Sequence, residues 1–195
     1  MPFSEESGGF GFGAIELSIL FEEFGKALVI EPYLSTVVLS GTILDKSSYS
    51  NKLDIIESIC SGAMHVSLAY AESSNKYDYL NPVANINSEN ILNGTKALVL
   101  NGANASKIIV SAASDSGFTL AIVDSNQDGV SITSFPTVDG QSCAEVSFEN
   151  VVLSEDSIIA QGDEAKELLL DAINLATLCI SAEAVGCMTS CYLKT

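Results

Sequence analysis

The sequence predicts an α+β fold with an N-terminal helical segment, a middle antiparallel β-barrel or sandwich, and the start of a C-terminal helical bundle. Apolar residues recur at helical spacing near the N-terminus, and short β-rich runs separated by turn signals follow. An apolar helical stretch fills the remainder. We therefore expect three domains, a partial helical domain at 1–62, a β-domain at 63–155 and the first part of a helical domain at 156–195.

The N-terminal segment is expected to form three helices. The first begins at Ala14, where apolar positions alternate with acidic ones at helical spacing. The second covers about 32–44 and begins at Pro32, a favourable first-turn residue. The third covers about 50–61 and ends at Gly62, which suits a C-terminal cap.

The middle segment switches to β-rich runs at 65–71, 83–87, 90–100, 107–113, 118–124, 130–134 and 144–149. The turn signals are Asn93-Gly94, Asn101-Gly102, Ser116-Gly117, Asp128-Gly129 and Asp139-Gly140. Spacing this regular favours a compact antiparallel barrel or sandwich. A last helix is expected from about Asp163 to the end. Its apolar faces predict burial between other elements, with the first helices and sequence outside this chain as the expected partners.

Composition excludes several classes of function. Twenty-five acidic residues against eight lysines, with no arginine, give a net charge of −17. The lysines are scattered singly, so the sequence predicts no nucleic-acid binding. Five cysteines without a CxxC pair, together with the single histidine His65, predict no metal site.

The chain is expected to be cytoplasmic and to lack a membrane span. Its longest apolar runs are interrupted by charges within about 20 residues, the length that a spanning helix needs. The N-terminus, MPFSEESGG, has neither the basic region nor the apolar core of a signal peptide.

The stretch from Met64 to Gly102 carries the most informative motifs. An apolar run ends in Tyr70-Ala71-Glu72, and a second run carries Asn93-Gly94-Thr95-Lys96 before Asn101-Gly102. This pattern resembles the middle β-domain of the flavin-dependent acyl-CoA dehydrogenases. Four other stretches are similar to that family in the same order: PFSEESGGFGFGAIELSILFEEFGKAL, PYLSTVVLSGTIL, DGQSCAEVSFENVVLSEDSII and ISAEAVGCM.

The resemblance implies an FAD-dependent α,β-dehydrogenation of an acyl-CoA thioester to the enoyl-CoA. A carboxylate base would take the α-proton while FAD accepts the β-hydride. It also implies electron-transfer flavoprotein as electron acceptor and a homo- or hetero-oligomeric assembly.

The same resemblance implies the residues of the site. Flavin contacts would come from Tyr70, Ala71, Leu98 and Leu100, and substrate contacts from Tyr77 and Asp78. The family usually has a threonine at Ala71, an aromatic residue at Leu98 and a threonine at Leu100, so two hydroxyls that would hydrogen-bond the flavin are missing. Each lost hydrogen bond is worth ~1 kcal/mol. Of the family's Pro-x-Ala-Gly-Ser-Asp loop, only Asp78 matches.

No catalytic base is expected within these residues. A minority of the family place the base ten residues before the glycine that resembles Gly186, and that position is Ala176. The resemblance therefore implies an incomplete chain that is inactive alone. The alternative is a non-catalytic partner subunit of a heteromeric acyl-CoA dehydrogenase that has lost flavin contacts, and a third interpretation is a binding module without redox chemistry.

Two charged residues in these motifs have structural interpretations. Glu72 fits a structural role at a strand end better than a functional carboxylate near the flavin. Lys96 in the Asn-Gly-x-Lys motif is expected to be a solvated hairpin residue.

Overall fold

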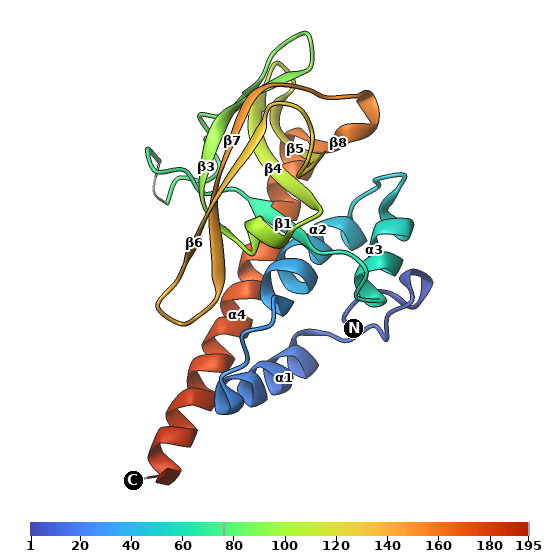
Figure 1. Ribbon diagram of the computed structural model, residues 1–195. Helices are drawn as coiled ribbons and strands as arrows, with labels where there is room; N and C mark the ends of the chain where they lie inside the picture. The colour runs from blue at the N-terminus through green and yellow to red at the C-terminus, as the bar shows by residue number, and fades with distance from the viewer. Residues whose placement is uncertain (76, 195) are drawn as a thin grey trace.

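Helices cover one side of a curled β-sheet (Figure 1). Residues 1–75 and 77–194, which the computed structural model describes, form four α-helices and an eight-stranded sheet. Lys76, in the predicted substrate loop, and Thr195, in the predicted last domain, lie outside the described residues.

The three predicted N-terminal helices are confirmed, except that the second begins as a π-helix and becomes α-helical only at Gly41. The helical elements are α1 (Ala14–Ala27), a π-helix (Leu34–Ser40) that continues into α2 (Gly41–Lys46), α3 (Lys52–Cys60) and α4 (Gly162–Lys194). Short 3-10 turns occur at Glu5–Ser7, Gly102–Asn104 and Glu155–Ser157. Gly62 follows α3 with a φ of 74°, as expected of a helix cap.

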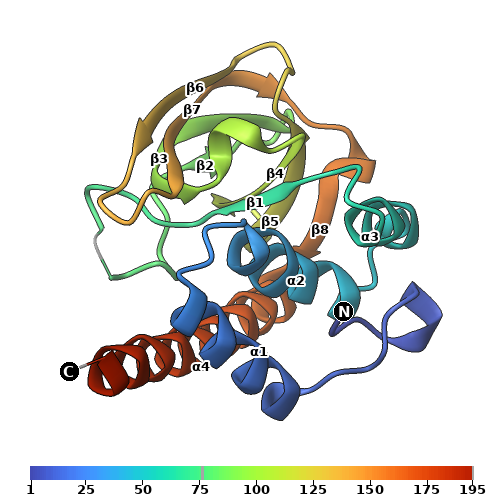
Figure 2. The same cartoon turned by 60° about the horizontal axis from the view of Figure 1, so that its bottom comes forward.

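The sheet is mixed rather than purely antiparallel. Its strands are β1 (Val66–Ala69), β2 (Asn85–Ile86), β3 (Ile91–Leu100), β4 (Lys107–Ser114), β5 (Gly117–Asp124), β6 (Val130–Pro136), β7 (Ser142–Val152) and β8 (Ile158–Gln161). They follow the order β6-β7-β3-β2-β4-β5-β8, with β1 paired to β4. Both β1 and β2 run parallel to β4, and the sheet curls round on itself above the helices (Figure 2). The predicted domain boundaries at 62/63 and 155/156 stay a prediction.

β4 links two hydrophobic cores. Ile108 and Val110 lie in the core inside the curled sheet, together with Phe148 of β7. Ile109 lies in the core between sheet and helices, together with Ile43 of α2. The alternation follows from the two-residue period of a strand, and it places both faces of β4 in apolar surroundings.

Helices α1 and α4 cross with their backbones almost in contact. A Cβ atom at Gly25 would lie 2.0 Å from the carbonyl oxygen of Glu183, and one at Gly186 would lie 2.0 Å from that of Glu22. Cys187 donates a hydrogen bond from Sγ to the Gly25 carbonyl, at 3.2 Å. The absence of a side chain at both glycines therefore sets the distance between these helices.

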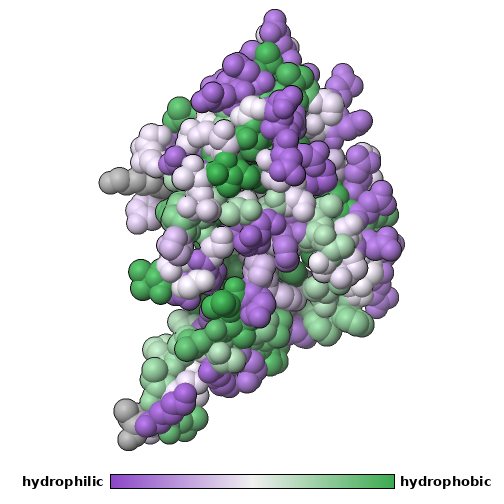
Figure 3. Space-filling model, viewed as in Figure 1, coloured by the Kyte–Doolittle hydropathy of each residue, from purple (hydrophilic) through white to green (hydrophobic). Residues whose placement is uncertain are grey.

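The last helix packs on α1 as expected, and the apolar faces of its C-terminal half that do not contact α1 are exposed; the expected packing of these faces on sequence outside residues 1–195 stays a prediction. Apolar side chains gather on the surface over the part of the molecule that holds α1 and α4 (Figure 3). The exposed apolar residues of α4 are Leu178, Ile180, Val185, Met188, Tyr192 and Leu193.

Among the described residues, α4 is also the one helix long and apolar enough to cross a membrane by length and composition, with 28% of that window buried. Glu183 is the one charged residue between Asp171 and Lys194, so a single charge interrupts this apolar stretch, as the sequence analysis described. Core helices of soluble proteins pass the same test.

Candidate functional site

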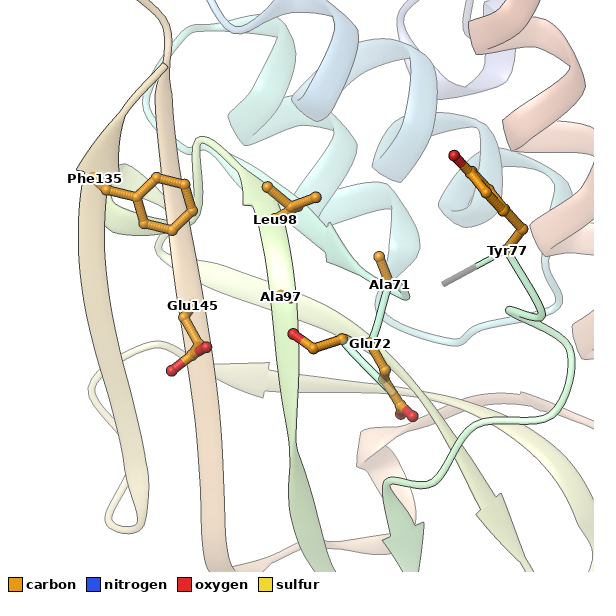
Figure 4. Close-up of a pocket in the computed structure, with 8 residues that line it drawn as sticks. Ala71, Glu72, Tyr77, Ala97, Leu98, Phe135 and Glu145 are labelled. Atoms are coloured by element: carbon orange, nitrogen blue, oxygen red, sulfur yellow. The ribbon is translucent and has the colours of Figure 1, made fainter. Parts of the chain in front are cut away.

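A pocket of about 420 Å³ opens where the end of β1 and the loop after it meet β3, β6 and β7. Its lining residues are Ala71, Glu72, Ser73, Tyr77, Ala97, Leu98, Phe135 and Glu145. Figure 4 shows Phe135 and Glu145 on one side of Leu98, and Ala71 and Tyr77 on the other. The walls are mainly apolar, which suits a flat aromatic ligand.

A β-bulge in β3 forms one wall of the pocket. The pairing with β7 passes from Lys96↔Val146 to Val99↔Ala144, so Ala97 and Leu98 together lie opposite Glu145. Leu98 takes a left-handed φ of 52° and its side chain is 62% exposed. The Ala97 N–H donates a hydrogen bond to the Ala71 carbonyl at 2.9 Å. The bulge thus turns Leu98 out of the ladder and ties it to the end of β1.

Beneath this wall lies a buried ion pair. Lys96 Nζ lies 2.6 Å from Glu72 Oε1, and the Lys96 side chain is 0% exposed. Lys96 also donates a hydrogen bond to Ser111 Oγ at 3.1 Å. Glu72 accepts two further hydrogen bonds, from the Val83 N–H at 2.7 Å and the Ala84 N–H at 3.0 Å. The expected structural role of Glu72 fits these contacts, whereas the expected solvation of Lys96 is wrong.

The Asn-Gly-x-Lys motif is not a hairpin. Asn93 and Gly94 lie inside β3, at a register shift between Leu92 and Gly94, and not between two strands. A Cβ atom at Gly94 would lie 2.5 Å from the Cβ of Ala84, and the φ of Gly94 is 144°. The glycine therefore allows a close approach of two chain segments, and local turn signals alone cannot distinguish this role from a hairpin.

Burial and the hydrogen bonds of the ion pair shift the pKa values of Glu72 and Lys96. Burial acts to raise the pKa of Glu72, but hydrogen bonds from Lys96, Ala84 and Val83 outweigh it and hold this pKa below 4.5. Burial lowers the pKa of Lys96 below 10.5, and the hydrogen bond to Glu72 opposes that shift.

Three of the six predicted site residues line the pocket. They are Ala71, Leu98 and Tyr77. Tyr70 and Leu100 pack against the core between sheet and helices instead, and Tyr70 makes an edge-to-face contact with Tyr79. Asp78 is exposed and accepts hydrogen bonds from the Asn81 side chain, so it holds the loop turn. Which of the six contact a ligand stays a prediction.

Sequence reasoning missed Glu145 and Phe135. Glu145 is exposed, and among the described residues no hydrogen bond or ion pair engages its carboxylate. It lies in a predicted strand, but its place in the pocket depends on the bulge register with β3. Phe135 enters from β6, whose pairing with β7 places it opposite Cys143. Neither residue has a local sequence signal that marks it as part of a site.

Comparison with known proteins shows which family the chain resembles. Residues 67–151 match the family model described as the acyl-CoA dehydrogenase middle domain. The mitochondrial isovaleryl-CoA dehydrogenase of Arabidopsis thaliana is 27% identical over 207 residues, which cover 96% of this chain and 49% of that protein. The chain is therefore similar to the acyl-CoA dehydrogenase family along almost its whole length. It spans about half the length of the curated relatives it matches.

Solved structures show the same fold. The ChsE4-ChsE5 complex from Mycobacterium tuberculosis matches with a TM-score of 0.82 at 24% identity, over 94% of this chain and 49% of the compared chain. A glutaryl-CoA dehydrogenase from Mycobacterium smegmatis in complex with FADH2 matches with a TM-score of 0.83 at 20% identity, over 92% of this chain and 49% of that one. These likenesses confirm the predicted α+β architecture of an acyl-CoA dehydrogenase.

The pocket fits part of the FAD cofactor that such enzymes use. Its volume and apolar walls suit the fused rings of the flavin, and the bulge at Ala97 and Leu98 brings backbone groups to its edge. Among the residues that line the pocket, Ser73 is the one with an aliphatic hydroxyl group. No lysine lines the pocket in the part of the chain that the structure describes, so these walls hold no cation for the pyrophosphate. The fit is therefore to the ring system.

Proposed function

We propose that this chain forms the flavin side of an FAD-dependent acyl-CoA dehydrogenase site, which converts an acyl-CoA thioester to the enoyl-CoA. The observation that carries the proposal is the convergence of Ala71 and Leu98 on one apolar pocket. These residues come from the end of β1 and from β3, and both are predicted flavin contacts. The match of residues 67–151 to the family's middle domain and the structural relative in complex with FADH2 support the proposal.

The residues of the pocket would bind and orient the ring system. Leu98 and Phe135 supply apolar walls that exclude water, and the backbone of the bulge supplies polar groups at fixed positions. FAD, when bound, would accept the β-hydride. Tyr77 lies on the loop after Glu72 and would face the acyl-CoA side of the pocket.

At the position of Ala176, helix α4 does not supply the base that would remove the α-proton. Ala176, the position that some relatives would use, is a buried methyl side chain in the core. We propose that the base comes from outside residues 1–195, either from a longer form of this chain or from another subunit. Electron-transfer flavoprotein would be the electron acceptor, and the assembly would be a homo- or hetero-oligomer.

A second candidate is a partner subunit that binds no flavin itself. Ala71, Leu98 and Leu100 lack the side-chain hydroxyls and the aromatic ring that the family usually presents at these positions. The structural relative from Mycobacterium tuberculosis is a complex of two differently named chains. These two observations support the alternative, in which a neighbouring paralogue holds the complete site.

FAD titration tests the first proposal. The purified protein is titrated with FAD and the quenching of flavin fluorescence is measured, beside Leu98→Glu and the control Val152→Glu. Val152 lies at the end of β7, is exposed and does not line the pocket. We expect the parent and Val152→Glu to bind FAD and Leu98→Glu to lose it. Equal affinity of all three would place any flavin elsewhere and overturn the proposal.

Co-expression distinguishes the second candidate. If the chain alone binds no FAD, it is purified with a paralogue of the same family and tested for anaerobic bleaching of the flavin by isovaleryl-CoA. A flavin-containing complex that is bleached supports the partner-subunit function. A chain that binds FAD on its own at the pocket contradicts it.

A further inference from the structure

The Glu72 carboxylate links the end of its own segment to two other chain segments around the pocket. We propose that Glu72 is a positioning residue, whose carboxylate holds the end of β1, the return of the following loop and β3 in the arrangement that forms the flavin pocket. The inference deepens the proposed function and rests on it for the identity of the ligand. The positioning itself is a property of the chain that can be measured without ligand.

The three bonds of the carboxylate reach two other segments of the chain. Oε1 accepts hydrogen bonds from Lys96 Nζ at 2.6 Å and from the Ala84 N–H at 3.0 Å, and Oε2 accepts one from the Val83 N–H at 2.7 Å. Lys96 belongs to β3, while Val83 and Ala84 lie just before β2. The second bond of Lys96, to Ser111 Oγ, extends the network to β4. One carboxylate therefore connects segments that are far apart in the sequence.

The loop after Glu72 is closed at both ends by this carboxylate. Its first residue is Ser73, and it returns at Val83, whose N–H the carboxylate binds. Tyr77 lies on this loop and forms part of the pocket wall. Because the described residues of the loop form no α-helix or β-strand, its ends determine where the wall lies.

The bulge on the opposite wall depends on the same network. Lys96 immediately precedes Ala97, whose N–H binds the carbonyl of Ala71, the residue before Glu72. The close packing of Gly94 on Ala84 brings β3 against the loop return. Displacing the Lys96 side chain would therefore move the bulge and Leu98 with it.

The chemistry at this point requires a carboxylate at position 72. Three donors share the two oxygens of the buried Glu72 carboxylate. Two of these donors are backbone N–H groups, which stay in place whatever residue replaces Lys96. A glutamine at this position would present one acceptor oxygen and an NH₂ group that has to face a donor. Exchanging the two charges would leave both backbone N–H groups facing an ammonium, so charge reversal cannot restore the arrangement.

The first readout is hydrogen exchange at the Val83 and Ala84 amides in the parent, in Glu72→Gln and in the double variant Glu72→Lys/Lys96→Glu. The control is Lys107→Met, which removes an ion pair of the same 2.6 Å length between Lys107 and Asp124, outside the pocket. We expect at least tenfold faster exchange of these two amides in Glu72→Gln and in the double variant, with β5 amides unchanged. Lys107→Met should stay within twofold of the parent.

The second readout is the dissociation constant for FAD, measured on the same variants together with their free energy of unfolding. We expect Glu72→Gln to weaken FAD binding at least tenfold and the control less than twofold. If the parent binds no FAD, the proposed function fails, and the exchange rates alone decide the positioning.

Several outcomes overturn the inference. Val83 and Ala84 amides as protected in Glu72→Gln as in the parent would show that another group holds the loop return. Restoration of protection or of FAD binding by the charge-reversed double variant would show that only the pairing of charges is needed. Should Glu72→Gln not fold, Glu72→Asp, which keeps the charge but shortens the side chain by one methylene group, replaces it. Val83 and Ala84 amides as protected in that variant as in the parent would overturn the inference.

Discussion

Lys96 Nζ lies 2.6 Å from Glu72 Oε1, and both side chains are buried between the pocket and the strands behind it. The two residues are 24 positions apart in the sequence, one after β1 and the other in β3. A buried charge is tolerated only when it is paired and hydrogen-bonded, and this pair has additional bonds to two backbone N–H groups and Ser111. The pair thus stabilises the region of the sheet that carries the pocket.

Removing one partner of the pair should destabilise the protein strongly. Lys96→Met leaves a buried carboxylate without its cation, and we expect a loss of about 3–5 kcal/mol in the free energy of unfolding. Lys107→Met, which removes the partly exposed pair with Asp124, should lose less than about 1 kcal/mol. Urea unfolding followed by circular dichroism measures both. Equal losses in the two variants would contradict the special role of burial.

The Glu72 carboxylate should add to the acid sensitivity of the fold. Its pKa in the folded protein lies below 4.5, so its ionised form contributes stability that is present above the unfolded pKa. That contribution is lost as pH falls below 4.5 and through the depressed folded pKa. We expect the difference in unfolding free energy between the parent and Glu72→Gln to shrink from pH 7 to pH 3. A difference that stays constant over this range would show that ionisation of Glu72 does not stabilise the fold.

Leu98 should show a conflict between stability and ligand binding. Its left-handed φ of 52° disfavours any residue with a Cβ, so Leu98→Gly should stabilise the backbone by about 1 kcal/mol. The same change removes an apolar wall of the pocket, and FAD affinity should fall.

Leu28 is the matched control for Leu98. It caps α1 with a φ of 53°, is exposed and does not line the pocket. Leu28→Gly should therefore give a similar gain in the thermal midpoint with no change in FAD affinity. Loss of FAD affinity in Leu28→Gly would show that the assay reports stability and not the pocket.

The α1–α4 crossing should not tolerate a methyl group. Alanine is a better helix former than glycine by about 1 kcal/mol, so local propensity predicts that Gly25→Ala and Gly186→Ala stabilise the helices. The 2.0 Å approach of each new Cβ to a carbonyl oxygen predicts the opposite, a net loss of about 1–3 kcal/mol. Thermal unfolding decides between them, with Ser181→Ala on the exposed face of α4 expected to change the stability by less than about 0.5 kcal/mol.

The structure differs from the sequence prediction where long-range packing outweighs local signals. The Asn93-Gly94 pair has the local chemistry of a hairpin turn, yet it lies inside β3 because Ala84 packs against the glycine. Strand β8 was not predicted, because its four residues become a strand only by pairing with β5. The parallel pairing of β1 with β4 likewise depends on the route of the chain and has no local signature.

The residues of the candidate site also divide into those that the sequence predicted and those that only the structure placed in the pocket. Ala71, Leu98 and Tyr77 were predicted from their positions beside motifs that resemble the family, although the residues themselves differ from those that the family usually has. Glu145 and Phe135 were missed, since their place in the pocket follows from the pairing of β7 with β3 and β6.

The sequence by itself determined the order of the helices and of strands β1 to β7, the resemblance to the acyl-CoA dehydrogenase family and the absence of side-chain hydroxyls at Ala71 and Leu100, because periodicity and motif identity are local properties. Only the tertiary structure decided that Lys96 is buried against Glu72, that a bulge turns Leu98 into the pocket, and that Glu145 joins it. These outcomes depend on which segments pair across the sheet, and the energy of pairing and burial comes from residues far apart in the chain.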